Sequence, residues 1–159
     1  MQLKRTVALG VAIAGLAPAA ALAAGLPKAP TALTGSGAKT AIRPANITWT
    51  GDGTGVLAGA TIRQPIHWSS WTAKQALGSG DDQLNNCNPA CANGKYKAYP
   101  VKLVLTRPLR SHGQLVFTRL TRTYTRAIPK GYKRTTTWTA SYVRAQGHSP
   151  ATFGWNYVG

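Results

Sequence analysis

Residues 99–126, YPVKLVLTRPLRSHGQLVFTRLTRTYTR, carry the strongest pattern in the chain and decide the fold class. Apolar and polar side chains alternate in 99–106, so that one face of an extended segment carries Tyr99, Val101, Leu103 and Leu105. The segment 114–126 has a similar face, formed by Val116, Leu120 and Tyr124. This alternation is typical of β-strands with one buried side. The stretch therefore predicts two neighbouring strands of a sheet.

Shorter strand signals lie on both sides of this stretch. β-Branched and aromatic residues mark four more extended segments, at 41–50, 64–72, 133–144 and 153–157. Helix signals are limited to one turn at 72–77. Many short strands predict an all-β fold of about six to eight strands. We expect a single antiparallel β-sandwich (immunoglobulin-like or jelly-roll-like) or a partly open barrel.

Glycine and proline mark the expected turns between these strands. Pro108 and Gly113 bracket a turn inside the central stretch, and Pro129 and Gly131 mark a second hairpin loop. We also expect Asp81 and the adjacent Asp82 to lie in a glycine-rich turn, where aspartate is favoured for backbone reasons.

The N-terminal residues have the features of a secretory signal peptide. Lys4 and Arg5 precede a short apolar run at 7–16, and small residues suit cleavage after Ala23. The run is shorter than the about 20 residues that span a bilayer. We therefore expect a signal peptide at 1–23, a secreted or cell-wall-associated protein, and no transmembrane segment in the mature chain.

Composition then suggests a boundary inside the mature chain. Residues 24–41 are small, bear proline and glycine, and include few large apolar side chains. Such a segment buries too little surface to offset the entropy of ordering, and it predicts a flexible leader. The remaining residues, 42–159, are enough for one modest hydrophobic core.

The two cysteines, Cys87 and Cys91, lie close together in NNCNPACANG. In an oxidising compartment an even pair predicts a disulfide. Zinc would need four ligands, and none of the histidines has a finger-like spacing. A thioredoxin-like role would need two intervening residues and a helix, but this pair has three, and Gly94 soon follows. We expect a local disulfide, with no metal and no cofactor.

The charge of the chain is strongly one-sided. It has 19 basic and 3 acidic residues, a formal net charge of +16. The acids are Asp52, Asp81 and Asp82, and no acid follows Gln83. Such a surface attracts polyanions, although a basic composition can also serve solubility alone. Export and the absence of a recognition motif argue against nucleic acid.

The basic residues of the second half of the chain are the candidate contacts for a polyanion. Arg119 differs in parity from Arg122 and Arg126, so the three do not form one ladder on a regular strand. The candidate ligand-binding residues are Lys95, Lys97, Lys102, Arg119, Arg122, Arg126, Lys133 and Arg134.

Four segments of the chain resemble a group of small exported proteins of actinobacteria. They are ITWTGDGTG at 47–55, HWSSWTAKQALGSG at 67–80, LNNCNPACANGKYKAYPVKLVLTRP at 84–108 and FTRLTRTYTR at 117–126. The resemblance implies secretion and an all-β domain. It implies no activity and no catalytic residue.

Residues suited to catalysis are scarce. A glycosidase would pair Asp52 with Asp81 or Asp82 across a scissile bond. Asp81 and Asp82 are neighbours in the sequence, and two carboxylates could hold calcium only weakly. No G-x-S-x-G elbow supports a serine triad, and His67 lies among tryptophans, which favours a packed residue. We therefore predict no catalytic residue and no metal ligand.

The tryptophans are numerous for this length, and each is expected in the core rather than at a sugar-binding surface. Trp68 and Trp71 differ by an odd number, which places them on opposite faces of a regular strand, so that one is expected in the core and the other is free to lie at the surface.

These observations give three hypotheses. The first is an exported, non-enzymatic domain that binds an anionic polymer or glycan of the cell envelope by electrostatics. The alternative is a secreted inhibitor or partner-binding protein that uses the disulfide-clipped loop 85–99. The third is a hydrolase.

Overall fold

The computed structural model describes residues 29–34, 39–50, 54–111, 113–143 and 152–158. Within these residues the protein is almost entirely β-structure, which confirms the all-β prediction. A short 3-10 turn, η1 (Cys91–Asn93), lies between two of the strands. The strands are β1 (Ala32–Leu33), β2 (Thr40–Ala41), β3 (Ile47–Thr48), β4 (Gly55–Ala58), β5 (His67–Trp71), β6 (Ala76–Asn85), β7 (Tyr96–Ser111), β8 (Gln114–Tyr124), β9 (Thr135–Val143) and β10 (Thr152–Val158).

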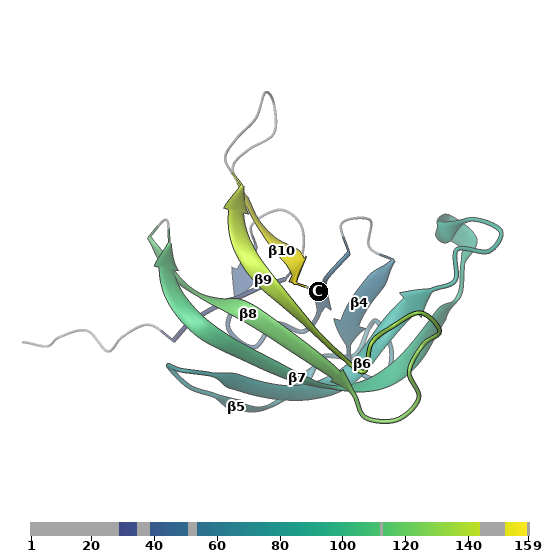
Figure 1. The fold of residues 1–159 in the computed structure, drawn as a ribbon, viewed down its shortest axis with the longest axis horizontal. Coiled ribbons are helices and arrows are strands. Elements are labelled where there is room, and N and C mark those ends of the chain that lie inside the picture. Colours follow the sequence, from purple (N-terminus) through teal and green to yellow (C-terminus); the bar gives the residue numbers. More distant parts are fainter. Residues whose placement is uncertain (1–28, 35–38, 51–53, 112, 144–151, 159) are drawn as a thin grey trace, which may run out of the picture.

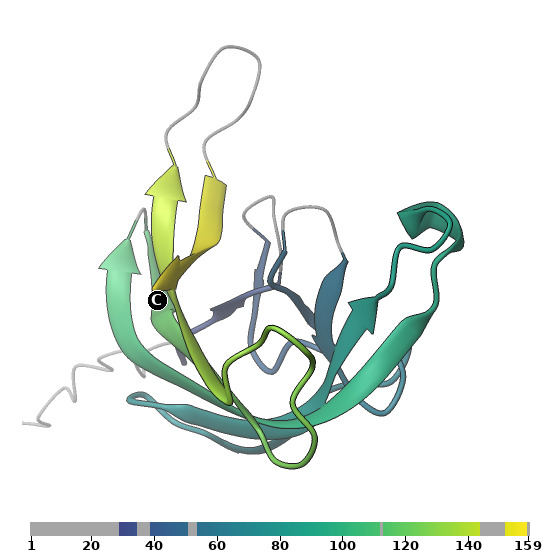
Figure 2. The same cartoon turned by 45° about the vertical axis from the view of Figure 1, so that its right-hand side comes forward.

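Eight strands form one sheet that curls around its own inner face (Figure 1). Its order is β10-β9-β8-β7-β6-β4-β3, and neighbouring strands are antiparallel. β5 pairs with the first half of β6 and β4 with the second half, so the sheet divides at β6. Figure 2 shows the curl as an open half-barrel. Of the two expected architectures, this is the partly open barrel.

The inner face of the curl is the hydrophobic core. Leu120 of β8 lies opposite Leu105 of β7 and Trp138 of β9. Directly opposed residues of an antiparallel pair point to the same side of the sheet, so these side chains form one layer. Val101 and Leu103 extend it along β7, and all five residues are buried. The alternation of the central stretch therefore lines the inside of the half-barrel.

The outer face of the same strands is polar and rich in threonine. Thr121 of β8 shares a hydrogen bond of 3.3 Å with Thr137 of β9, and Thr123 shares one of 3.2 Å with Thr135. An antiparallel sheet with one apolar and one wet face is the arrangement that the sequence pattern predicts.

β6 is a central strand that the sequence pattern did not predict. The helical turn expected at 72–77 and the turn expected at Asp81 and Asp82 are both wrong, because Ala76–Asn85 pairs with β7 along its whole length. The glycines in β6 serve close packing. A Cβ atom on Gly78 would lie 2.7 Å from Cε3 of Trp68. Glycine in a strand commonly marks such close approaches.

The turn in the central stretch is tighter than expected. β7 continues through Pro108 to Ser111, and the chain reverses next to Gly113, whose φ is +77°. Proline is tolerated here because the pairing of β7 with β6 ends at Leu105, so no ladder on that side needs its missing N–H. The hairpin loop at Pro129 and Gly131 is confirmed between β8 and β9.

Trp68 and Trp71 lie on the same side of β5, not on opposite sides. The register of β5 against β6 shifts between Trp68 and Ser70, and this bulge changes the parity of the strand. The two indole rings meet edge to face, with centroids 4.9 Å apart. Both pack against the core, so neither is the surface residue that opposite faces would have allowed.

The N-terminal described residues belong to the fold. Ala32 and Leu33 are fully buried, and Thr31 pairs with Val116 in β8. These residues and β2 fall inside the stretch 24–41 for which a flexible leader was predicted. The segment 1–23, which is predicted to be a signal peptide cleaved after Ala23, lies outside the described residues. Within the described part, no helix has the length and hydrophobicity to cross a membrane.

Candidate ligand-binding site

An open hollow of about 520 Å³ lies where β6 exchanges β5 for β4 as its neighbour. Two glycines allow the chain to approach itself closely here. A Cβ on Gly80 would lie 2.0 Å from the carbonyl oxygen of Ala58, and one on Gly59 would lie 2.6 Å from that of Pro65. The division of the sheet therefore depends on residues that have no side chain.

The hollow lies on the outer face and carries polar and charged groups. His67, Ser79 and Lys102 are directly opposed on β5, β6 and β7, so they point to the side away from the core. Asp81 and Arg126 complete the charged lining. Burial raises the pKa of Asp81. The hollow thus combines two permanent cations with one carboxylate.

The lining includes the residue types of a serine triad but not its geometry. Ser79, His67 and Asp81 all border the hollow. None of the hydrogen bonds among the described residues joins any two of the three. A nucleophile needs a base within hydrogen-bond reach. The arrangement as it stands offers binding groups and no activated nucleophile.

A second polar feature is fully buried inside the half-barrel. Asp82 is 0% exposed and Arg122 is 1% exposed, and they form an ion pair of 2.5 Å from Nη1 to Oδ2. Tyr124 donates its hydroxyl to Oδ2 at 2.5 Å, and Trp49 donates Nε1–H to Oδ1 at 2.9 Å. Arg122 also donates Nη2–H to Thr136 at 3.1 Å. A buried charge is tolerated when it is paired and hydrogen bonded in this way.

This cluster perturbs the titration of its members. Burial raises the pKa of Asp82, against the opposing effect of the Arg122 guanidinium and three donated hydrogen bonds. Burial, and then the hydrogen bond to Asp82, raise the pKa of Tyr124 far above its usual range. Burial also raises the pKa of Tyr132.

Four aromatic rings enclose the Arg122 guanidinium. Its Cζ lies 4.5 Å from the ring centroid of Tyr124, 4.8 Å from Trp138, 5.0 Å from Trp49 and 5.6 Å from Tyr132. Cation–π attraction holds at these distances. The cage fixes the side chain from several sides and makes it a rigid part of the inner face.

The structure brings only some of the predicted polyanion contacts together. Lys102 and Arg126 meet at the hollow. Arg122 is buried inside the half-barrel, so it is not part of the outer basic surface. Arg119 is partly exposed on β8. The remaining candidates are exposed in two separate regions: Lys95 and Lys97 around the start of β7 after the disulfide, and Lys133 and Arg134 between β8 and β9.

The position of Arg122 along its strand is a signal in the sequence that this arginine is buried. Arg122 has the same parity as Leu120 and Tyr124, which were placed on the core face of their strand. Its partner Asp82 lies 40 residues away in the sequence, in a segment read as a turn. Strand parity outweighs the general preference of arginine for the surface once a carboxylate is available inside.

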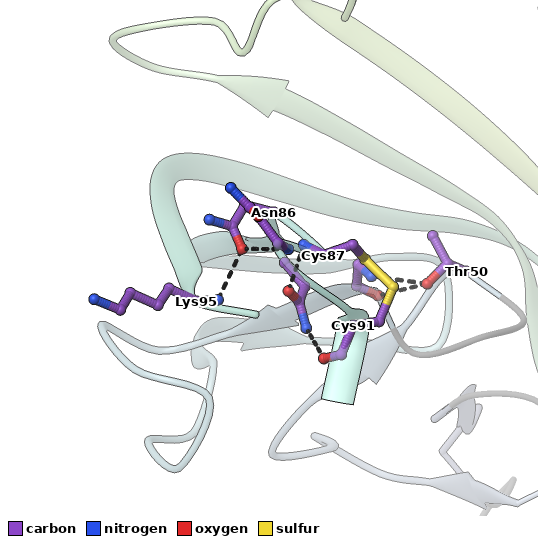
Figure 3. The surroundings of a disulfide bond; sticks show 8 residues. Thr50, Asn86, Cys87, Cys91 and Lys95 are labelled. Carbon is purple, nitrogen blue, oxygen red and sulfur yellow. Dashed lines mark hydrogen bonds between the residues drawn. A yellow bond between two sulfur atoms is a disulfide. The ribbon is translucent and has the colours of Figure 1, made fainter. Parts of the chain in front are cut away.

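The two cysteines form a disulfide, Cys87–Cys91, and the described residues include no free cysteine. Figure 3 shows Asn86 and Lys95 beside the disulfide, and two asparagine side chains support the loop. Asn85 accepts a hydrogen bond from the Cys87 N–H at 2.9 Å and donates one to the Cys91 carbonyl at 2.8 Å. Asn86 accepts the Lys95 N–H at 2.9 Å. All of these hydrogen bonds join residues of the exposed hairpin tip. The disulfide and the asparagines therefore stiffen the tip, and none of these bonds involves a core residue.

The described residues contain no group of three or more His, Cys, Asp or Glu side chains that could hold a metal ion. Asp81 and Asp82, the pair considered for weak calcium binding, point to opposite sides of β6, and Asp82 is fully buried. The glycosidase pairing involved Asp52, which lies outside the described residues.

No protein-family model, no curated protein and no solved structure matches this chain. The resemblance to small exported proteins of actinobacteria therefore stays a prediction.

Proposed function

We propose that this protein is a binding protein that attaches to an anionic polymer or glycan by electrostatics and makes no covalent change to it. The observation that carries the proposal is the position of the acidic residues. Asp82 is neutralised inside the core by Arg122. Among the described residues, Asp81 is then the carboxylate left to compensate the exposed lysines and arginines. A surface with one sign of charge concentrates polyanions around it.

The outer hollow is the proposed contact point. Lys102 lies there on β7, and Arg126 lies there in the loop just after β8. Lys95 and Lys97, exposed beyond the disulfide, are a second contact for an extended polymer. With the signal peptide expected at 1–23, the polymer would be a component of the cell envelope or of the extracellular matrix.

A salt titration tests the proposal. Binding to dextran sulfate is measured from about 50 mM to about 500 mM salt, with uncharged dextran as the matched polymer. We expect the affinity for dextran sulfate to fall by about tenfold or more, because salt screens exposed charges. We expect no binding to dextran. Affinity that is independent of salt, or equal for the two polymers, would overturn the proposal.

Matched variants then locate the contact. Lys102→Gln with Arg126→Gln removes two charges at the hollow, and Lys74→Gln with Arg110→Gln removes two exposed charges elsewhere. Both variants have the same net charge, so a difference between them reports position. We expect the hollow variant to lose more affinity. Equal losses would mean that net charge alone, and not the hollow, attracts the polymer.

A second candidate function is recognition of a protein partner by the hairpin tip. The disulfide and the bonds of Asn85 and Asn86 hold residues 86–95 in one conformation, and Pro89 and Ala90 are exposed there. A rigid loop loses little entropy on binding. Stoichiometric co-purification with one protein, abolished by Cys87→Ser with Cys91→Ser, would support this function.

A further inference from the structure

A second cavity, separate from the outer hollow, is built around the caged arginine. It has a volume of about 250 Å³ and is lined by Trp49, Arg122, Thr136, Trp138 and three residues of the β8–β9 loop, Gly131–Lys133. Arg122 and Thr136 are directly opposed on β8 and β9, on the face that also carries Trp138. The cavity therefore opens from the inner side of the half-barrel, under the β8–β9 loop.

The arginine in this cavity retains a free donor. Arg122 is 1% exposed, and its Nη1 and Nη2 donate to Asp82 and Thr136. Its Nε–H has no hydrogen-bond partner among the described residues, although it is fully buried. A buried donor without an acceptor is costly.

The charges of the lining favour an anion. Arg122 and Lys133 are both cationic, and the lining includes no carboxylate among the described residues. Asp82 neutralises one of these charges from the core side, so the cavity keeps an excess of about one positive charge. Aromatic cages of this kind often receive an ammonium ligand. Here the guanidinium already occupies that place and would repel such a ligand.

The aromatic rings favour a ring-shaped ligand. Trp49 and Tyr132 stand nearly perpendicular, at 88° with centroids 6.3 Å apart, and Trp49 lies 5.2 Å from Trp138. The volume is below the range of about 300–1,000 Å³ typical of drug-sized ligands, so the cavity suits one ring. The apolar face of a pyranose ring packs well on indole and phenol rings, which also carry polar groups for its hydroxyls.

We propose that this cavity binds a single acidic sugar residue, with its ring against Trp49 and Tyr132 and its carboxylate directed to the exposed Lys133, on the side of the positive charge of Arg122. The inference goes beyond the proposed attachment to a polymer, which depends on the outer face and requires no recognition of a single residue. A protein with both sites would hold a polyuronate by general attraction outside and by one specific ring inside.

Glucuronate and glucose are the probes, because they share the ring and differ in the carboxylate at C6. Binding is followed by NMR shifts of Tyr132, Lys133 and Thr136, all lining residues. We expect saturable binding of glucuronate and affinity for glucose lower by about tenfold, since hydrogen bonds to a charged group are the stronger ones. Equal shifts for the two sugars, or shifts that never saturate, would overturn the assignment.

Lys133→Met and Tyr132→Ala test the named contacts on exposed residues, whose replacement leaves the core intact. The matched controls are Lys130→Met, in the same loop, and Tyr96→Ala, on β7; neither residue lines the cavity. We expect the first two variants to lose glucuronate binding and the controls to keep it. Unchanged binding in Lys133→Met and Tyr132→Ala would refute the site.

The two proposals fail separately. The variant Lys102→Gln with Arg126→Gln changes the outer hollow alone, and we expect it to bind glucuronate normally. The variant Tyr132→Ala should keep its salt-dependent attachment to dextran sulfate. If glucuronate binding is absent while attachment to the polymer persists, only the inner site is disproved.

Discussion

Strand β6 is fixed at Asp82 by noncovalent contacts, and the hairpin tip that follows it is fixed by the Cys87–Cys91 disulfide. At Asp82 the strand is held by noncovalent contacts with distant residues: Trp49 is 33 positions away, Arg122 is 40 and Tyr124 is 42. At the Cys87–Cys91 tip it is held by a covalent bond across 4 positions, and by asparagine bonds that span 2 to 9.

The two regions differ in how much of the fold depends on them. Asp82 connects β6 with the segment after β3 and with β8, so it links strands across the inside of the half-barrel. The bonds of the tip join residues of one hairpin. We therefore expect changes at Asp82 to affect the whole sheet and changes at the tip to remain local, although the tip is the more conspicuous sequence motif.

The largest effect is expected from Asp82→Asn. It leaves the buried Arg122 guanidinium without its counter-charge, and removing one partner of a buried pair costs about 3–5 kcal/mol. The measurement is the free energy of unfolding in denaturant. The control is Asp81→Asn, which removes the same charge one residue away on the outer face and is expected to change stability by about 0.5 kcal/mol or less. Similar losses in the two variants would contradict the internal role of Asp82.

A smaller loss is expected from Tyr124→Phe. The substitution removes the hydroxyl that donates to Asp82 at 2.5 Å and leaves the ring in the cage. Hydrogen bonds to charged groups contribute about 1.5–3 kcal/mol. Tyr132→Phe is the control, because Tyr132 is 39% exposed. In a double variant with Asp82→Asn, the loss should be less than the sum, since both act on one cluster. Additive losses would show that the hydroxyl acts elsewhere.

Much of the strand content was predictable, because apolar and polar residues alternate along these segments with the two-residue period of a β-strand. β7, β8 and β9 lie within or close to the segments assigned from alternation, and their register follows from which face is apolar. The half-barrel needed more than this. Its division at β6 lies at glycine positions where two backbones come together, and these look like turn signals in the sequence.

The sites were less predictable than the sheet, because they depend on pairs far apart in the chain. Asp82 was read as a turn residue and Arg122 as a surface cation, and each reading was reasonable for the residue alone. Only the ion pair between Asp82 and Arg122 explains why both side chains are buried. The side of β5 on which Trp71 lies was mispredicted for a similar reason. The prediction assumed a regular strand, and the bulge in β5 places Trp71 on the same side as Trp68.

The disulfide comes next in the expected order of effects. Closing a loop of about five residues contributes about 2 kcal/mol by chain entropy. We expect Cys87→Ser with Cys91→Ser to lower the free energy of unfolding by no more than this, and reduction of the native protein to produce the same change. Hydrogen exchange should increase in residues 86–95 and stay unchanged in β8. A loss as large as that of Asp82→Asn would show that the tip supports the sheet after all.

Alkaline pH should reveal the buried cluster without mutation of its charges. The pKa of Tyr124 is raised from 10.0 in the folded protein, so the folded state keeps this proton while the unfolded chain releases it. The stabilisation from Tyr124 is therefore complete below about pH 10 and decreases above it, by about 1.4 kcal/mol per pH unit. Lysines and other tyrosines also titrate in this range, and for that reason the native protein is compared with Tyr124→Phe at each pH. Their difference in stability should shrink as the pH rises from about 10 to about 11. A constant difference would mean that Tyr124 ionises as readily in the fold as outside it, which its position at 1% exposure against Asp82 does not allow.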